Sequence, residues 1–248
     1  MGDEMILDVY KDAFEYSAQD WTALVKLGVI NVLGMFIFLP LFLISGYNYR
    51  VIKIGVKGMI NGEDKLPEFD EWVNMFVDGI KVFIVEFAYA LIPIVLFFAV
   101  LFSAASLGGN AGGIVMALGM IISIVLFILL PLMGIIGIAN MAENDDKLSA
   151  AFDINGIIEI IKSIGWLNTI ATWIGVQIIV GVISIVVFLL LYAILMFLGL
   201  STAMVSSNIA GGVFGIGFIL IIAILCFLVT PYLSIFQSRV YGLLYNLQ

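Results

Sequence analysis

Glu86 is the residue of this 248-residue chain whose position most suggests chemistry. It lies near the start of a long apolar stretch, and the next charged residue along the chain is Glu143. A carboxylate inside a membrane is unfavourable unless it is paired, protonated or in contact with water, so it is by default a candidate for an ion or proton pathway. Alternatively, Glu86 reaches interfacial water or Lys81, and the sequence leaves both interpretations open.

A basic helical segment suggests contacts with lipid. Arg50, Lys53 and Lys57 recur at helical spacing within residues 46–62. A cation close to an anionic bilayer surface gains roughly 1 kcal/mol from the lipid headgroups. We therefore expect headgroup contacts from these three side chains, while any cytoplasmic flank of a membrane protein has a similar composition.

The remaining polar residues do not form a recognisable reactive site. Acidic residues gather within 63–78 and 143–153 without the spacing of a metal-binding loop, so we interpret them as solvated surface and predict no metal. Histidine, the commonest general base, is absent, and the single Cys226 allows no intramolecular disulfide. The sequence also has no phosphate-binding loop and no nucleophile elbow. It predicts no catalytic residue, no cofactor, no enzyme activity and no nucleic-acid partner.

The composition requires a membrane around the elements that position Glu86. The chain is 63% hydrophobic and 11% charged, whereas soluble domains have roughly 45–50% apolar and about 25% charged residues. Between Glu86 and Glu143 lie 143 − 86 − 1 = 56 uncharged residues, and between Lys162 and Arg239 lie 239 − 162 − 1 = 76. One crossing takes about 20 residues, so each run holds two crossings.

The fold class predicted from this pattern is an all-α, polytopic transmembrane helix bundle that forms one integral membrane domain over residues 1–248. An amphipathic segment over 1–20 precedes the expected membrane segments 22–45, 82–101, 114–139, 167–198 and 213–236. Short interfacial amphipathic helices are expected around 46–62 and 152–164. The first membrane segment is either a span kinked at Pro40, which we prefer, or a re-entrant hairpin bent near Gly34 and Pro40.

The basic residues predict the orientation. Eight of the ten Lys and Arg residues lie in the loops 46–81 and 140–166 or near the C-terminus. Cytoplasmic loops carry an excess of Lys and Arg, so we expect these parts to be cytoplasmic in a multi-pass protein of the cell membrane. The N-terminus then lies outside if the first segment is a span, and inside if it is a hairpin.

Residues 66–72 predict an elbow at the membrane interface. Pro67 favours an extended conformation at Leu66, and Asp70 is placed to cap the helix that follows. Trp72 belongs to a residue type that prefers the headgroup region. We interpret Pro67, Asp70 and Trp72 as a structural elbow, with docking of a partner as the alternative.

Several strings resemble an uncharacterised family. These are Gly46-Tyr47, Leu66-Pro67-Glu68-Phe69-Asp70-Glu71-Trp72, Phe76-Val77-Asp78-Gly79 and Ile92-Pro93. Together they are similar to the signature of a largely archaeal family of multi-pass membrane proteins that is catalogued as a domain of unknown function. The resemblance covers mainly residues 10–100 and implies a membrane location and an archaeal source, with no activity, cofactor or catalytic residue.

Two classes of function follow from the sequence. The first is a non-enzymatic scaffold, accessory protein or oligomer-forming subunit, which would contact membrane lipids and a second copy or another membrane protein. The alternative is a transporter or channel-like protein for a small solute or ion, with Glu86 on its route. A membrane-embedded lipid enzyme is a third and weaker alternative.

Overall fold

The structure is a computed structural model that describes residues 2–248, with side chains from Met5 onward, and these residues form helices without any strand. The elements are α1 (Gly2–Ser17), α2 (Trp21–Phe36), α3 (Pro40–Lys57), α4 (Trp72–Leu107), α5 (Gly109–Glu143), the 3-10 helix η1 (Leu148–Phe152), α6 (Ile154–Ile164), α7 (Trp166–Ala203), α8 (Ser207–Ile224), the π-helix η2 (Leu225–Val229) and α9 (Thr230–Tyr245). The all-α fold class predicted from the sequence is confirmed.

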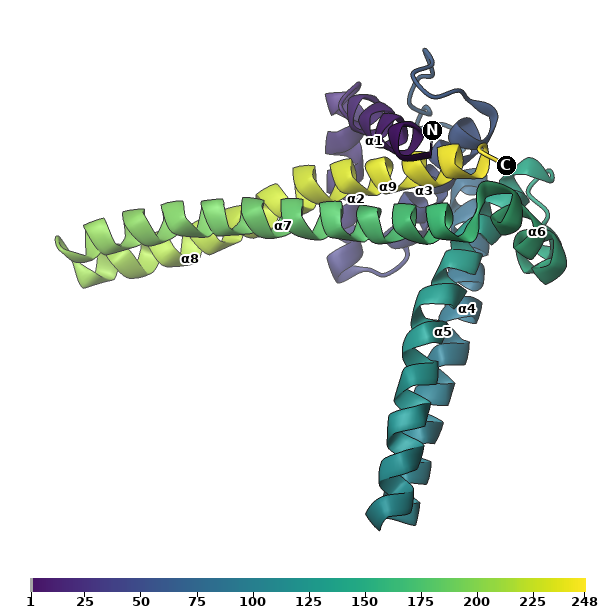
Figure 1. The fold of residues 1–248 in the computed structure, drawn as a ribbon. Coiled ribbons are helices and arrows are strands. Elements are labelled where there is room, and N and C mark those ends of the chain that lie inside the picture. The colour runs from purple at the N-terminus through teal and green to yellow at the C-terminus, as the bar shows by residue number, and fades with distance from the viewer. Residues whose placement is uncertain (1) are drawn as a thin grey trace.

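Two long helical hairpins extend in different directions from one compact part, where both termini lie (Figure 1). The first hairpin consists of α4 and α5, and the second consists of α7 and the continuous run α8–η2–α9. These four helical runs are long and apolar enough to cross a membrane. Beyond Glu86, α4 continues for 107 − 86 = 21 residues, or about 32 Å, which matches the roughly 30 Å of a hydrocarbon core.

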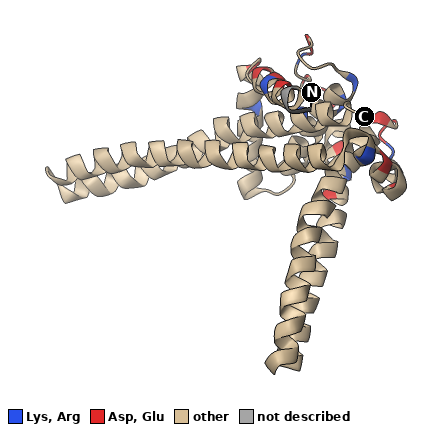
Figure 2. Cartoon of the chain, viewed as in Figure 1, with Lys and Arg blue, Asp and Glu red and all other residues tan. Residues whose placement is uncertain are grey.

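The charged residues gather on the compact part, and the hairpins are almost free of them (Figure 2). In the most apolar 18-residue stretch of each long helix, at most 17% is buried inside the protein. The exposed residues on these stretches are mainly Ile, Leu, Val and Phe. Lipid or another membrane chain must therefore cover most of the hairpin surface, because water would leave this apolar area at a large free-energy disadvantage.

The structure corrects our preferred interpretation of residues 22–45 as a single span. Helix α2 ends at Phe36, three residues form a turn, and α3 begins at Pro40. Proline lacks the N–H group that a helix interior needs but is favoured in the first helical turn, so Pro40 starts a new helix here. Because α2 has 16 residues and a length of about 24 Å, it is too short to span. The bend between α2 and α3 lies where the hairpin alternative predicts it, and the place of this hairpin in the membrane stays a prediction.

Helix α3 buries its apolar face in the protein core. It packs against α4, α5 and α9, and its Tyr47, Tyr49 and Val51 are fully buried. Close contact is possible because Gly46 faces the backbone of α4 at Met75, and Gly55 faces Gly242 of α9. The periodicity of residues 46–62 therefore reflects a protein-facing stripe.

Helix α1 also buries its apolar face against protein. Its Val9, Ala13 and Tyr16 are buried, and the helix packs on α9 and, through fewer contacts, on α7. The amphipathic segment predicted at the N-terminus is thus a helix that covers α9. The side chains of Asp3 and Glu4 lie outside the described part of the chain.

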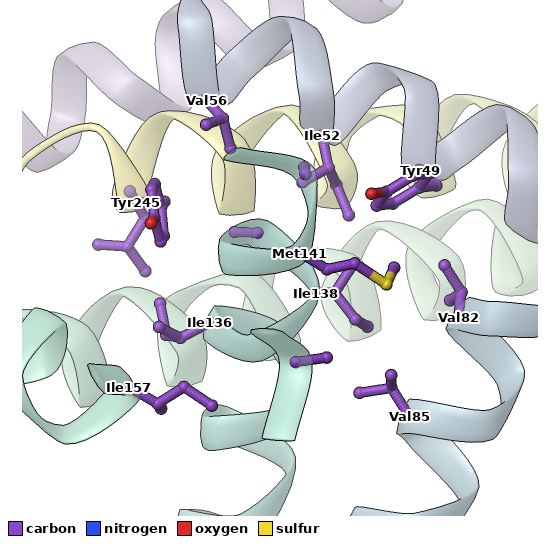
Figure 3. Packing of buried hydrophobic residues seen from close by; sticks show 14 of the residues in the cluster. Tyr49, Ile52, Val56, Val82, Val85, Ile136, Ile138, Met141, Ile157 and Tyr245 are labelled. Carbon is purple, nitrogen blue, oxygen red and sulfur yellow. The ribbon is translucent and has the colours of Figure 1, made fainter. Parts of the chain in front are cut away.

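The largest hydrophobic cluster joins the bases of the two hairpins to α3 (Figure 3). Tyr49 and Ile52 of α3 lie over Met141 of α5, while Val82 and Val85 approach from α4. Ile157 of α6 and Tyr245 of α9 complete the cluster from the other side. These contacts fix the register of α4 and therefore the direction in which Glu86 points.

The glycines at the hairpin ends have different roles. Gly108 and Gly109 adopt φ values of +59° and +50°, which favour glycine and reverse the chain between α4 and α5. Gly112 lies against the backbone of Ala104, so it allows close packing of the two helices. In contrast, a Cβ atom added at Gly211 or Gly215 would meet nothing within 4 Å.

Candidate functional site

Glu86 lies where two cavities meet. The smaller cavity has a volume of about 140 Å³ and the larger one about 430 Å³. Both are lined by the same five residues, Glu86, Ile135, Ile138, Gln237 and Tyr241. The only charged residue that lines either cavity within the described part of the chain is Glu86.

The larger cavity lies between the bases of the two hairpins. Helices α4 and α5 supply one wall, and α7 and α9 supply the other. Its polar and aromatic lining residues are Glu86, Tyr89, Trp173, Gln177, Gln237 and Tyr241. Gln177 donates a hydrogen bond from Nε2 to the Tyr241 hydroxyl at 3.1 Å, which joins the two helices of the second hairpin beside Glu86.

Helix α4 places Glu86 at the edge of its buried stripe. Val82, Val85 and Tyr89 are buried and form one stripe of the helix. Glu86 follows Val85 by one residue and is rotated from it by about 100°, since the helix has 3.6 residues per turn. It is therefore exposed on the side that faces the cavities.

The structure does not pair Glu86 with Lys81. The Lys81 ammonium lies 3.2 Å from Asp78 Oδ1, one turn nearer the start of α4. Among the described residues, no salt bridge or hydrogen bond holds the Glu86 carboxylate. The structure thus removes the pairing with Lys81 and places the carboxylate beside two cavities. The ion pathway and the contact with interfacial water both stay predictions.

The two prolines near Glu86 lie at similar levels of the first hairpin, because Gly134 of α5 faces Tyr89 of α4. Pro93 is inside α4 and Pro131 is inside α5, and Pro131 also lines the larger cavity. A proline inside a helix removes one backbone hydrogen bond and bends the helix. These positions mark where the lipid-exposed arms leave the cavity walls.

The chemistry of the larger cavity suits an organic cation. A carboxylate supplies negative charge, amide side chains supply hydrogen-bond acceptors, and aromatic rings attract cations through their faces. Such a combination of a mostly apolar lining with a few polar groups is typical of small-molecule sites. Its volume lies within the roughly 300–1,000 Å³ of ligand pockets.

A charged cleft on the compact part uses two of the three predicted lipid-binding cations. Arg50 Nη1 lies 2.6 Å from Asp70 Oδ1, and Lys53 Nζ lies 2.8 Å from Asp146 Oδ2. Lys57 is exposed and forms no salt bridge with the described residues. Headgroup contact by Arg50, Lys53 and Lys57 stays a prediction. Of the three side chains, Lys57 is the one that is exposed and free of a salt bridge with the described residues.

The loop predicted to form the elbow precedes α4, but Asp70 does not cap that helix. The position of the loop at the membrane interface stays a prediction. Glu71 occupies the N-cap with φ of +45° and makes no side-chain capping bond, and Asp70 binds Arg50 instead. Phe69 stacks on Tyr47 with a centroid distance of 4.5 Å, which fixes the loop to α3. Pro67 lines the charged cleft, and Trp72 is exposed as the first residue of α4.

Sequence reasoning missed a buried ionic cluster that joins the two ends of the chain. Arg239 of α9 is fully buried, and its Nε lies 2.7 Å from Asp12 Oδ1 of α1. Its Nη2 lies 2.9 Å from Asp64 Oδ2, a close ion pair without hydrogen-bond alignment. The Tyr16 ring lies 4.5 Å from the guanidinium carbon. The available signal was Asp12 on the apolar stripe of α1.

Asp146 is an acidic group in the loop that follows α5. Burial raises its pKa, but hydrogen bonds from Lys53 and Tyr49 and the charges of Lys53 and Lys81 lower it, and the net pKa lies below the ordinary carboxyl value. A carboxyl whose pKa is lowered by folding stabilises the protein above its unfolded-state pKa of about 3.9, and this contribution is lost as the pH falls through the folded-state value.

We therefore expect Asp146→Asn to lower the melting temperature in detergent at pH 7, and we expect this difference to shrink as the pH falls toward the lowered folded-state pKa of Asp146. The reason is that a protonated Asp146 and the uncharged amide of the variant are similarly unable to pair with the Lys53 ammonium. Thermal unfolding followed by tryptophan fluorescence between pH 7 and pH 3 measures this. The same difference in melting temperature between the variant and the unmodified protein at every pH would contradict a lowered folded-state pKa for Asp146.

Comparison with known proteins identifies a family and supplies no activity. A family model described as "Protein of unknown function (DUF4013)" matches residues 29–192, which are 164 of the 248 residues. No curated protein matches the chain, and no solved structure matches it. The match includes the first hairpin with Glu86 and most of α7. The chain belongs to the DUF4013 family of proteins of unknown function.

Proposed function

We propose that this membrane protein is a non-enzymatic transporter that binds a small organic cation at Glu86. The observation that carries the proposal is the unpaired carboxylate at the junction of two cavities, between hairpins that are long and apolar enough to cross a membrane. A buried or membrane-embedded charge without a protein partner is unfavourable. An ammonium ligand would compensate it, and the aromatic residues Tyr89, Trp173 and Tyr241 would add cation–π attraction.

The cavity position supports movement of the ligand rather than storage. The larger cavity faces the space between the hairpins, whereas the smaller one continues toward α3 and the charged part of the molecule. A carboxylate between two such spaces can bind a cation from either of them. We propose in addition that the charged part lies at the cytoplasmic face of the cell membrane, as the distribution of Lys and Arg suggests.

Binding of benzyltrimethylammonium to the protein in lipid nanodiscs tests the site. We expect Glu86→Gln to weaken binding at least tenfold, because it removes the charge that attracts the cation. Two unit charges about 4 Å apart near a protein surface interact by about 4 kcal/mol, whereas a tenfold change in affinity needs about 1.4 kcal/mol. Glu159→Gln is the matched control, since Glu159 is an exposed carboxylate on α6 that lines neither cavity. Isothermal titration calorimetry gives both affinities.

Flux measurements in proteoliposomes then separate binding from transport. We expect uptake of the same cation by the unmodified protein and loss of uptake in the Glu86→Gln variant. Equal binding by the Glu86→Gln and Glu159→Gln variants would overturn the site, and binding without uptake would overturn the transport role.

A second candidate function, the scaffold or accessory subunit, is favoured by the exposed apolar surface of the hairpins. Only 6–17% of the most apolar 18-residue stretch of each long helix is buried inside the protein. The remaining surface leaves room for a second copy or another membrane chain beside lipid. Native mass measurement of the complex extracted with lipid tests this. A stable oligomer without cation uptake would favour the scaffold role.

A further inference from the structure

The charged cleft on the compact part lies close to the smaller Glu86 cavity. The cleft has a volume of about 580 Å³ and is lined by Lys53, Lys81 and Asp146, among others. The smaller cavity is lined by Ile52 and Val82, which neighbour Lys53 and Lys81 in α3 and α4. A partition of a few side chains therefore separates the surface cleft from the cavity that reaches Glu86.

Tyr49 of α3 bridges this partition. Its side chain is buried in the cluster of Figure 3 and lines the smaller cavity. Its hydroxyl donates to Asp146 Oδ1 at 2.7 Å, and Asp146 lines the cleft. Lys53 Nζ donates to the other oxygen, Asp146 Oδ2, at 2.8 Å. The carboxylate of Asp146 thus holds Tyr49 in place from the cleft side.

The smaller cavity can hold water on the way to Glu86. Its polar lining residues are Ser45, Asn48, Tyr49, Glu86, Ser234, Gln237, Ser238 and Tyr241. Its volume of about 140 Å³ is well above the roughly 10–15 Å³ that one water molecule needs, and water requires polar partners of this kind. The Ser234 hydroxyl lies 3.3 Å from Asn48 Oδ1 and shows that polar groups face one another here.

We propose that Tyr49 is the gate of a water-filled entrance that leads from the charged cleft to Glu86. With the hydroxyl held by Asp146, the ring closes the partition. When Asp146 releases the hydroxyl and the ring rotates, water and small cations pass from the cleft into the smaller cavity and reach the carboxylate. The identity of the passing ion rests on the proposed function, whereas the gated entrance does not.

The reactivity of a thiol inside the smaller cavity tests the gate. Ser238→Cys places a thiol in the lining, and Cys226→Ser removes the single native thiol. The probe is the water-soluble, cationic thiol reagent methanethiosulfonate ethyltrimethylammonium, applied to the protein in nanodiscs. We expect slow modification in this background and at least a tenfold faster rate when Tyr49→Ala is added.

Two further variants keep the outcome decisive. Tyr245→Ala is the matched control, because Tyr245 belongs to the same buried cluster, also donates a side-chain hydrogen bond, and lines neither the cleft nor the smaller cavity. Asp146→Ala removes the acceptor of the Tyr49 hydroxyl without opening a hole in the core. It should therefore also accelerate modification, and it replaces Tyr49→Ala if that variant fails to fold. Equal rates in the Tyr49, Asp146 and Tyr245 variants would overturn the gate.

The result is independent of ligand binding at Glu86. Faster modification in the Tyr49 and Asp146 variants without any benzyltrimethylammonium binding would leave the gate in place and overturn the organic-cation site. Rapid modification with Tyr49 unchanged would show an open entrance and contradict the gate, even if the cation binds.

Discussion

Asp12→Asn is expected to destabilise the protein by about 3–5 kcal/mol, because it leaves the fully buried guanidinium of Arg239 without its closest carboxylate. Asp12 also accepts a hydrogen bond from the Asn61 backbone at 2.6 Å, so the change weakens the connection of α1 to the loop after α3. Unfolding by SDS titration in mixed micelles measures the loss.

The matched control for this prediction is Asp8→Asn. Asp8 lies on the same helix, is exposed and makes no salt bridge with the described residues. We expect its effect to stay within about 0.5 kcal/mol, as for most surface substitutions. If both variants unfolded at the same SDS fraction as the unmodified protein, the cluster around Arg239 would not stabilise the fold.

Gly79→Ala is expected to cost about 3 kcal/mol, at the upper end of the range for overpacked sites. Gly79 of α4 faces Phe42 and Gly46 of α3, and an added Cβ atom would collide with the backbone carbonyl of Phe42 and approach the Gly46 nitrogen to 3.0 Å. Backbone atoms cannot rotate away as a side chain can, so the two helices must separate.

Gly215→Ala on α8 is the control for the glycine prediction. A Cβ atom there meets nothing within 4 Å, and alanine is favoured over glycine in a helix interior by roughly 0.5–1 kcal/mol. We expect unchanged or slightly raised stability in the same SDS titration. Equal loss at both glycines would mean that the contact between α3 and α4 is not the reason for Gly79.

The four long helices were predictable from charge spacing. Long stretches without charge, such as those after Glu86 and after Lys162, require about 20 residues per crossing and can hold only a whole number of crossings. The sequence did not determine whether the helix breaks at Pro40, because proline is compatible with both a kinked span and a new helix. Only the turn that follows Phe36 decides between them.

The surroundings of the amphipathic helices were not predictable. Periodicity identifies the apolar faces of α1 and α3, but the same pattern serves lipid and protein neighbours. In the structure both faces meet other helices. Similarly, Arg239 follows a long apolar stretch, as the basic residues of cytoplasmic flanks do. Its partner Asp12 lies 227 positions away in the sequence, so no local pattern connects the two residues.

The candidate site was only partly visible in the sequence. Glu86 stands out because it is a charge at the edge of an apolar run. Gln177, Gln237 and Tyr241 reach it from other helices, and the sequence suggests only that such polar groups bond between helices. Their convergence depends on the way the two hairpins join α3.

The archaeal source implied by the resemblance stays a prediction.

Reaction with a lipophilic carbodiimide tests most directly that Glu86 faces a cavity between membrane-embedded hairpins. Dicyclohexylcarbodiimide enters the hydrocarbon region and forms a stable N-acylurea on carboxyl groups there, which mass spectrometry of peptides locates. We expect one adduct on Glu86 in nanodiscs, its loss in Glu86→Gln, and protection by benzyltrimethylammonium. Adducts confined to the carboxylates of the loops, with Glu86 unmodified, would contradict this account.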